Sequence, residues 1–428
     1  MTTESAVTMG ESVAVKPRTT GTNPGVTLEP AAAGFDERRL GRLAAYLDEC
    51  VARGLNRGSI VLVARRGELV HVSSHGTRDA EGRLPVEPDT IWRLYSMTKP
   101  VTSVAALMLW EEGVLSLSDP VERFLPSFAR MRVARPGADG ATVPAVEPVR
   151  IRHLLTHTAG LTVTGLADNA VNDAYRAAGI AALGEPEPYT LDELCERLAS
   201  LPLLFEPGSA WNYSHATDVL GRIIEIASGM RLDEFMAKRI FEPLAMTDTG
   251  YRLPADDRPA ALYRLNPRTG RPELMPDPGV AAGDLPTLVA GGHGLLSTAR
   301  DYQRFVQLLA RGGELDGERL LAPRTVDLMA ANHLPGDSTM SAFSHPPART
   351  TGIHAGRGFG LGVAPLLDPR SVDSLSSAGE YGWGGAAGTN FWVDPEEDLT
   401  VLFMTQVMPP PDDTWLALRR LVYQALVS

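Results

Sequence analysis

The sequence predicts an α/β protein with two lobes, one built from both ends of the chain and one, mainly helical, inserted between them. Strand patterns occur early, at 59–64 and 69–73, and return only late, at 388–393 and 399–404. Helical spacing of apolar residues dominates the long stretch from about 97 to 245. With 428 residues, 44 % of them hydrophobic, the chain can bury a large core. We therefore expect strands from both ends to meet in one lobe.

Each element can be justified in chain order. Residues 1–34 contain no aromatic side chain and are rich in Thr, Ser, Gly, Pro and Ala, so they are expected to form a disordered tail. The segments 59–64 and 69–73 should form a hairpin across Arg66-Gly67. The segment 163–190 lacks periodicity and is a candidate cover for an active site. The remaining expected elements are helices at 35–53, at 302–309 and from about 415, and a strand at 358–366.

These patterns divide the chain into three regions. A tail comprises residues 1–34. The α/β lobe is expected to comprise 35–95 and 291–428, and the mainly helical lobe 96–290. Because both lobes would contribute residues, the cleft between them is the expected place of an active site.

Composition excludes several classes of partner. The net charge is −12, and no long run of like charge occurs, which disfavours nucleic acid and anionic membranes as partners. Two cysteines, Cys50 and Cys195, provide no disulfide framework, and Cys195 is expected in a helical core. No signal-like segment opens the chain, and no apolar run approaches membrane-spanning length. We expect a cytoplasmic protein that acts on a small molecule; its oligomeric state stays open.

Lysine is rare in this chain, and its placement is informative. Only three of the 40 basic residues are lysines, and one of them, Lys99, lies three positions after Ser96. Arginine stays protonated, whereas a desolvated lysine can lose its proton and accept another. A serine with an adjacent amine base is a nucleophile for acyl transfer. The tetrapeptide alone does not establish Ser96 as a nucleophile, because about one Ser-x-x-Lys occurs by chance in a chain of this length.

The residues around Ser96 predict the geometry that this chemistry requires. Pro100 is tolerated only in the first turn of a helix, so a helix should begin near Ser96 and continue through 104–110. Ser96 and Lys99 would then share one face of its first turn. The free N–H groups at this end of a helix can stabilise an oxyanion.

Two later segments carry further groups suited to the same reaction. Tyr213 precedes an amphipathic helix, with Ser214 as the expected N-cap, so its phenol would be fixed in place and reachable. Near the C-terminus, the glycine-rich run 381–390 leads into Phe391-Trp392-Val393. Glycines in a strand mark a backbone that another group approaches closely, here an acyl group against the strand edge.

In their order and spacing these motifs resemble those of the serine hydrolases related to class C β-lactamases and DD-peptidases. The resemblance is strongest to the branch of family VIII carboxylesterases and polyketide-type acyltransferases, and it runs from about Phe35 to the C-terminus. The segments 151–161, 241–250 and 291–301 agree as well. It implies a serine β-lactamase/DD-peptidase-like fold, an antiparallel sheet flanked by helices with an inserted helical lobe.

Carried over residue by residue, the resemblance implies Ser96 as the nucleophile and Lys99 as its base. Tyr213 would share the proton relay and protonate the leaving alcohol. The N–H groups of Ser96 and Ala386 would form the oxyanion hole. No metal or organic cofactor is implied. The expected substrate-binding residues are Trp383, Gly384, Gly385 and His215.

Two departures from the family pattern indicate the branch. β-Lactamases and DD-peptidases carry Lys-Thr-Gly or His-Thr-Gly where this chain has Trp383-Gly384-Gly385, and a neutral indole cannot replace an ammonium facing a substrate carboxylate. The Tyr-x-Asn triplet is also missing, because His215 stands in place of the asparagine. Both changes disfavour peptides and lactams. Ester chemistry needs only a good leaving alcohol and an oxyanion hole.

Other residues have competing interpretations. His215 could tune Tyr213 or touch the substrate, or simply be packed near the start of its helix. His153 and His157 have i,i+4 spacing but lack the glutamate of His-Glu-x-x-His, which favours a structural pair over a metal site. The run 291–294 lacks phosphate-loop spacing and indicates a tight turn. The chain contains no Gly-x-Ser-x-Gly, so Ser96 has no rival motif.

Three functions follow from these observations, and the sequence does not separate the first two. A carboxylesterase for short-chain or compact esters would resolve the acyl-enzyme on Ser96 with water. An acyltransferase would use the same intermediate with a specialised alcohol or amine acceptor. A catalytically silent binding protein is disfavoured by the intact Ser96, Lys99 and Tyr213. Lactam, peptide and amide hydrolysis are disfavoured by the two departures.

Overall fold

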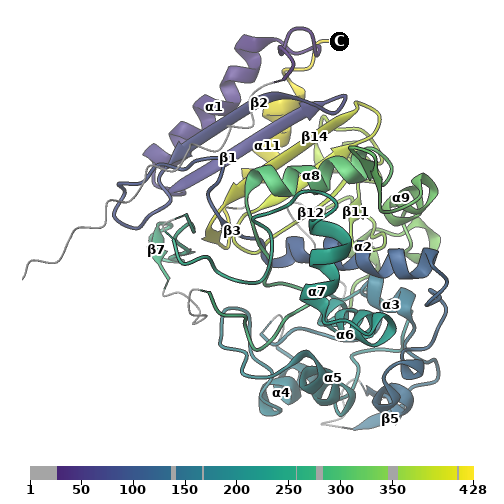
Figure 1. The fold of residues 1–428 in the computed structure, drawn as a ribbon. Helices are drawn as coiled ribbons and strands as arrows, with labels where there is room; N and C mark the ends of the chain where they lie inside the picture. The colour runs from purple at the N-terminus through teal and green to yellow at the C-terminus, as the bar shows by residue number, and fades with distance from the viewer. Residues whose placement is uncertain are drawn as a thin grey trace, which may run out of the picture.

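A six-stranded antiparallel sheet joins the two ends of the chain, with the strand order β11-β12-β13-β14-β1-β2 (Figure 1). The computed structural model describes residues 27–135, 141–165, 168–256, 258–275, 283–345, 355–411 and 414–428. The strands are β1 (Gly58–Arg65), β2 (Glu68–Gly76), β11 (Ala364–Pro365), β12 (Tyr381–Gly384), β13 (Asn390–Asp394) and β14 (Leu399–Thr405). The predicted antiparallel sheet and the hairpin across Arg66-Gly67 are confirmed.

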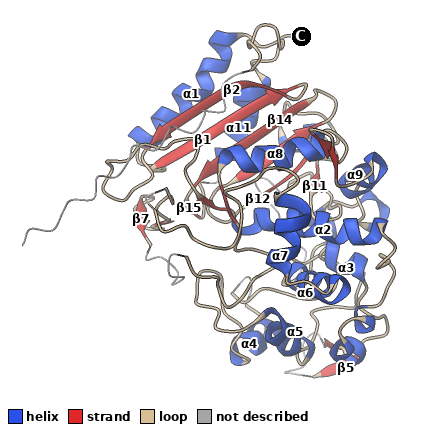
Figure 2. Ribbon diagram, viewed as in Figure 1, coloured by secondary structure: helices blue, strands red, loops and turns tan. Residues whose placement is uncertain are grey.

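Helices cover both faces of the sheet (Figure 2). Val61 and Val63 of β1 pack with α1 (Glu37–Ala52) and α11 (Thr414–Tyr423). The alternate residues, Ile60 and Leu62, face the main core, where α8 (Ala299–Ala310) contacts β13 and β14. Because both faces are buried, residues 60–64 of β1 form an unbroken apolar run rather than an alternating one.

The helical part of the molecule lies below the sheet in Figure 1, and α2 runs between the two. Residues Thr98 to Leu109 of α2 are all buried, and the helix contacts α6 and α7. The apolar run Val104 to Leu109 suits a helix that is buried on all sides. The helices here are α2 (Thr98–Glu111), α3 (Ile151–Leu155), α4 (Ala170–Ala177), α5 (Leu191–Ala199), α6 (Ala216–Ser228) and α7 (Leu232–Met236).

Short elements complete the described chain. The remaining helices are α9 (Pro323–Ala330), α10 (Met340–Phe343), the π-turn Ala237–Phe241 and the 3-10 turns Tyr95–Met97, Val121–Arg123, Pro126–Arg130, Pro335–Asp337 and Pro369–Val372. The remaining strands are β3 (Trp92–Arg93), β4 (Arg132–Ala134), β5 (Thr142–Pro144), β6 (Tyr263–Leu265), β7 (Pro272–Leu274), β8 (Leu296–Ser297), β9 (Glu314–Leu315), β10 (Glu318–Arg319) and β15 (Val407–Met408). In the described ranges, no helix combines the length and apolarity needed to cross a membrane.

Two sequence expectations need comment. The strand predicted at 358–366 is wrong except for β11, because Gly360 turns tightly, its N–H bonding to Val363 O at 2.7 Å, and Gly362 adopts a φ of 93°. Most of the predicted tail, residues 1–26, lies outside the described residues. The described remainder contacts the body, since Thr27 N–H bonds to Leu69 O at 2.8 Å and Ala33 is fully buried. The division into two lobes stays a prediction.

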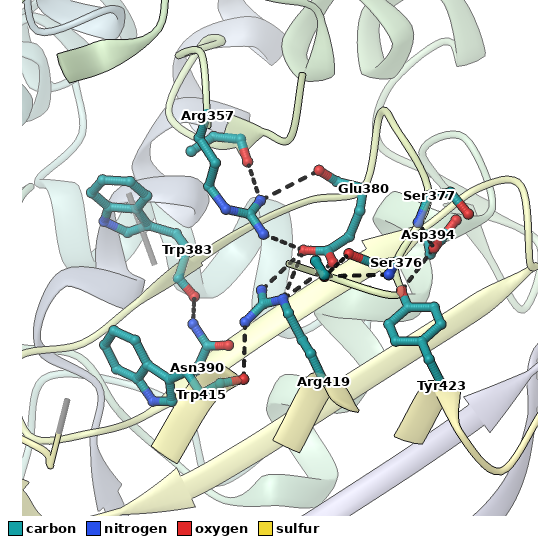
Figure 3. Close-up of polar contacts among 12 residues, drawn as sticks. Arg357, Ser376, Ser377, Glu380, Trp383, Asn390, Asp394, Trp415, Arg419 and Tyr423 are labelled. Carbon is teal, nitrogen blue, oxygen red and sulfur yellow. Dashed lines mark hydrogen bonds and ion pairs between the residues drawn. The ribbon is translucent and has the colours of Figure 1, made fainter. Parts of the chain in front are cut away.

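A buried ion cluster fixes the start of β12 (Figure 3). Glu380, with no exposed surface, pairs with Arg357 at 2.6 Å and with Arg419 of α11 at 2.9 Å. Arg357 also donates to Ala364 O in β11 at 3.0 Å. Burial raises the pKa of Glu380, but the charges of Arg419 and Arg357 lower it more, from its usual 4.5 to about 2. The cluster therefore joins β11, β12 and α11.

Glu380→Gln is expected to lower the free energy of unfolding by about 3–5 kcal/mol at pH 7, because two buried arginines would lose their counter-charge. The carboxylate stabilises the fold above its ordinary pKa of 4.5, and this contribution is lost as the pH falls toward about 2. Chemical denaturation between pH 2 and pH 7 should therefore show the variant's deficit shrinking in acid. Asp368→Asn, in an exposed pair with Arg370, is the control. A variant as stable as the parent at pH 7 would contradict a stabilising cluster.

Candidate active site

Ser96 lies in the 3-10 turn Tyr95–Met97 that leads directly into α2, which begins at Thr98. The helix start predicted from Pro100 is therefore confirmed. Ser96 is half-buried, between the fully buried Met97 and the partly exposed Tyr95. Tyr95 has a φ of 47°, in the left-handed region that bulky residues avoid. Backbone strain of this kind is concentrated at functional sites, where the surrounding structure holds it.

Lys99 and Tyr213 meet although they are far apart in the chain. The Lys99 side chain is buried, and its Nζ lies 4.5 Å from the centre of the Tyr213 ring. Nζ also donates a hydrogen bond to Gly292 O at 2.8 Å. Three separate segments thus converge one helical turn beyond Ser96: the first turn of α2, the loop before α6 and the 291–294 turn.

The Tyr213 hydroxyl is buried and has no hydrogen-bond partner among the described residues. Leaving such a group unpaired is unfavourable by about 1–3 kcal/mol. The ring itself is well fixed, with Trp383 at 5.8 Å and His157 at 4.8 Å between ring centres. A rigid phenol whose hydroxyl lacks a partner is suited to receive one from a bound substrate.

His157 packs against the Tyr213 ring and is itself held by a hydrogen bond. Its Nδ1 lies 3.0 Å from Ser214 Oγ, and Ser214 Oγ accepts the Ala216 N–H at 3.1 Å. Burial, assisted by the charge of Lys99, holds the pKa of His157 well below its usual range, so the ring is neutral. The structural role predicted for His157 is confirmed, and so is that of His153, whose Nδ1 accepts the Arg150 N–H at 3.2 Å.

Two local details of these segments differ from expectation. The helix α3 ends at Leu155, so His157, with a φ of 54°, lies outside it and the i,i+4 helical spacing was wrong. The residue at the N-cap of α6 is His215, not Ser214. Ser214 lies one position before the N-cap, and its Oγ still accepts the Ala216 N–H at the start of the helix.

The glycine-rich turn after β12 lies against the segment that carries Ser96. A Cβ atom on Gly385 would stand 2.3 Å from Leu94 O, and Thr389 Oγ1 donates to the same oxygen at 3.3 Å. In the described part of the chain, neither the Ala386 N–H nor the Ser96 N–H has a hydrogen-bond acceptor. A Cβ on Gly384 would come within 3.1 Å of the Trp415 ring. Close packing therefore requires glycine at position 385 and leaves little room for a side chain at position 384.

Trp383 and His215 are both buried, in different surroundings. The Trp383 ring packs edge-on against Phe359 at 5.2 Å and beside Tyr213. His215 donates from Nδ1 to Asp218 Oδ2 at 2.8 Å, and its ring stacks on Tyr175. His215 is thus paired with a carboxylate, while Trp383 lies beside the predicted catalytic phenol.

A pocket of about 460 Å³ opens next to this site. Tyr95 and Arg93, which are close to Ser96 in the chain, line it, and the segments 183–188 and 284–288 form further parts of its wall. The first of these belongs to the aperiodic stretch that the sequence singled out as a candidate cover. Its other lining residues are Tyr251, Leu253, His293, Gly294, Leu295 and Leu296. Its volume suits a compact organic molecule.

His293 is a polar residue in the wall of this pocket. Its Nε2 lies 3.3 Å from Glu187 Oε1. Burial lowers the pKa of His293, but Glu187 and Asp218 raise it more, so the net shift is upward. The sequence did not predict that the carbonyl of the neighbouring Gly292 accepts a hydrogen bond from Lys99 Nζ. It did not single out Asp218 either. The only signal was the run of glycines at 291–294.

Comparison with known proteins agrees with this arrangement. Residues 43–424 match the family model described as Beta-lactamase. Esterase EstB of Burkholderia gladioli is 34 % identical over 89 % of this chain and 93 % of its own. Lovastatin esterase of Penicillium rubens is 30 % identical over 85 % of this chain and 92 % of its own. The solved structure of EstCE1, "a hydrolase with promiscuous acyltransferase activity", has a TM-score of 0.76 at 30 % identity and covers 90 % of this chain and 99 % of that one.

The fold, the Ser-x-x-Lys helix and these matches define a serine hydrolase. The chain belongs to the Beta-lactamase family, on the side of its esterases and acyltransferases. The fold class, family and enzyme class predicted from the sequence are confirmed.

Proposed function

We propose that this enzyme hydrolyses carboxylic esters through an acyl-enzyme on Ser96. The observation that carries the proposal is the meeting of Lys99 and Tyr213, with Nζ 4.5 Å from the phenol ring, one turn beyond Ser96. The substrate would be a small neutral ester occupying the 460 Å³ pocket. Both cysteines are free and buried, which fits the cytoplasmic location expected from the sequence.

The chemistry follows from these groups. Ser96 Oγ forms a bond to the ester carbonyl carbon while its proton passes to Lys99, which acts as the base. The negative charge on the carbonyl oxygen is held by the N–H groups of Ser96 and Ala386. When the carbon–alkoxide bond breaks, Tyr213 gives its proton to the leaving oxygen and is reprotonated by Lys99. Water then attacks the acyl carbon and gives a proton to Lys99. The bond between that carbon and Ser96 Oγ breaks, Oγ takes the proton back from Lys99, and the carboxylic acid leaves.

The surroundings of Trp383 favour esters over lactams. Its ring is buried among Tyr213 and Phe359, so an apolar surface stands where a substrate carboxylate would need a cation. His215, in place of the asparagine of related lactamases, is already paired with Asp218. Two anchors for a lactam or peptide are therefore lacking.

The enzyme is expected to turn over p-nitrophenyl butyrate with a far higher kcat/KM than nitrocefin. Each missing charge-assisted contact lowers the rate by about ten- to a hundredfold, so only trace lactamase activity should remain. Trp383→Lys alone should not restore it, because the pocket around the indole is apolar. Steady-state kinetics on both substrates decide the matter. A kcat/KM for nitrocefin equal to that for the ester would overturn the proposal.

Acyl transfer is the second candidate, because EstCE1, a structural neighbour, is titled as a hydrolase with acyltransferase activity. The pocket is large enough for an acceptor as well as for a leaving group. Intact-protein mass spectrometry after mixing with an activated ester would reveal the acyl adduct on Ser96. Faster loss of the adduct on adding an alcohol, with the transesterified product formed, would establish transfer.

A further inference from the structure

Asp218 is a buried carboxylate in the first turn of α6, and the steps above do not use it. Its side chain is 3 % exposed. Oδ1 accepts the Gly292 N–H at 2.7 Å, and Oδ2 accepts a hydrogen bond from His215 Nδ1 at 2.8 Å. A carboxylate taken out of water is tolerated only when its oxygens are hydrogen-bonded, and here both are.

The same Gly292 is the partner of Lys99. Its carbonyl accepts the hydrogen bond from Lys99 Nζ at 2.8 Å, and the neighbouring Gly291 O accepts from Thr102 Oγ1 at 2.6 Å. Lys99 and Thr102 lie three residues apart, on one face of α2. The backbone of Gly291 and Gly292, called the 291–292 strip below, is therefore hydrogen-bonded to α2 on one side and to Asp218 of α6 on the other.

Gly291 and Gly292 leave little room for a side chain between these groups. A Cβ atom on Gly292 would lie 3.0 Å from Asp218 Oδ1 and 3.2 Å from Lys99 Nζ. One on Gly291 would lie 2.2 Å from Thr217 O. The carboxylate and the amine thus approach one another across a single backbone residue, with no side chain between them to weaken their interaction.

We propose that Asp218 is a positioning residue for Lys99, acting through Gly292. It holds the strip whose carbonyl aims Nζ, and its charge stabilises the ammonium that forms when Ser96 gives its proton to Lys99. His215 in turn holds the carboxylate. The proposal rests on the function proposed above, in which Lys99 is the base.

The charge of Asp218 is constant during turnover. Burial raises its pKa, but the hydrogen bond and charge of His215 and the charges of His293 and Lys99 lower it more, from 3.8 to about 2. The carboxylate is therefore ionised wherever ester turnover is measured. Because Asp218 does not line the pocket, its loss should change the rate of proton transfer and not the binding of substrate.

The test is Asp218→Asn, which keeps the size of the side chain and an oxygen for the Gly292 N–H but removes the charge. Stopped-flow release of p-nitrophenolate should show an acylation rate lower by about ten- to a hundredfold. The substrate concentration giving half the maximal burst rate should stay unchanged. Asp301→Asn is the matched control, because Asp301 is also buried in the first turn of a helix and accepts a backbone N–H, that of Asp248, at 2.7 Å. Its acylation rate should equal that of the parent.

A second variant keeps the test decisive if Asp218→Asn does not fold. Gly292→Ala retains both Asp218 and Lys99 but inserts a methyl group between them, at a φ outside the left-handed region. Its acylation rate should fall by about tenfold or more. A parental acylation rate in Asp218→Asn would overturn the inference about Asp218. If only Gly292→Ala folds, a parental rate in that variant would do the same. In either case an inactive Lys99→Arg would still support the proposed function. An active Lys99→Arg would overturn the base role itself.

Discussion

Ser96→Ala is expected to lower kcat for p-nitrophenyl butyrate by at least about a thousandfold, the largest single loss available in this chain. The substitution removes the proposed nucleophilic hydroxyl, so the acyl-enzyme cannot form. Residual hydrolysis would come from the oxyanion donors and from substrate binding alone, as with other nucleophile deletions. The variant should also show no acyl adduct by intact-protein mass spectrometry.

The folded structure should survive this change. Ser96 is half-buried and lies in a turn held by its neighbours, so the melting temperature is expected to stay close to that of the parent. Ser103→Ala is the control, because Ser103 is fully buried farther along the same helix. It should keep its activity. Retention of more than about one hundredth of the parental kcat in Ser96→Ala would refute the nucleophile assignment.

Lys99→Arg is expected to be nearly as damaging as Lys99→Ala, each lowering kcat by about a hundred- to ten-thousandfold. Arginine keeps the positive charge and most of the volume, but it cannot lose a proton to become a base. It would also have to place a planar guanidinium where a single Nζ now donates to Gly292 O at 2.8 Å. Steady-state and burst kinetics on the same ester measure the effect.

The chain supplies its own control for this substitution. Lys238 is exposed in the π-turn after α7, so Lys238→Arg makes the same chemical change away from the site. Its kinetics should match those of the parent. If Lys99→Arg kept substantial activity, the lysine would act only through its charge, and Tyr213 would become the first candidate for the base.

The segments proposed to be catalytic could be predicted from sequence because their signals are local. Pro100 lies in the first turn of α2 and marks the start of the helix. The spacing of Ser96 and Lys99 could therefore be interpreted as one helical turn. The strand and turn around Gly385 followed from its glycines, and the close approach to Leu94 O shows why they are required. The assignment of Tyr213 came from a family resemblance, and the structure brings its ring to Lys99.

What sequence could not supply is the contact between distant segments. Asp218 and Gly292 are joined by a 2.7 Å hydrogen bond that no spacing rule predicts. The 358–366 segment alternates glycine and apolar residues as a strand would, yet its glycines serve a tight turn. His157 lies past the end of α3, where a left-handed residue breaks the helical spacing that the sequence suggested. Each failure occurs where tertiary packing overrides a local pattern.

Two parts of the pocket wall lie in segments of the chain that are remote from Ser96 and Lys99, the groups proposed to move protons. Lys99 lies in the buried helix α2, Ser96 lies in the turn before it, and the 291–292 strip is tightly packed between Lys99 and Asp218. The 183–188 and 284–288 walls are loops, and Leu183 is 47 % exposed. Mutations in these loops can reshape the space offered to a substrate without disturbing the proton-transfer groups. Evolution in the laboratory or in nature can therefore change which ester is accepted while the reaction itself is inherited intact.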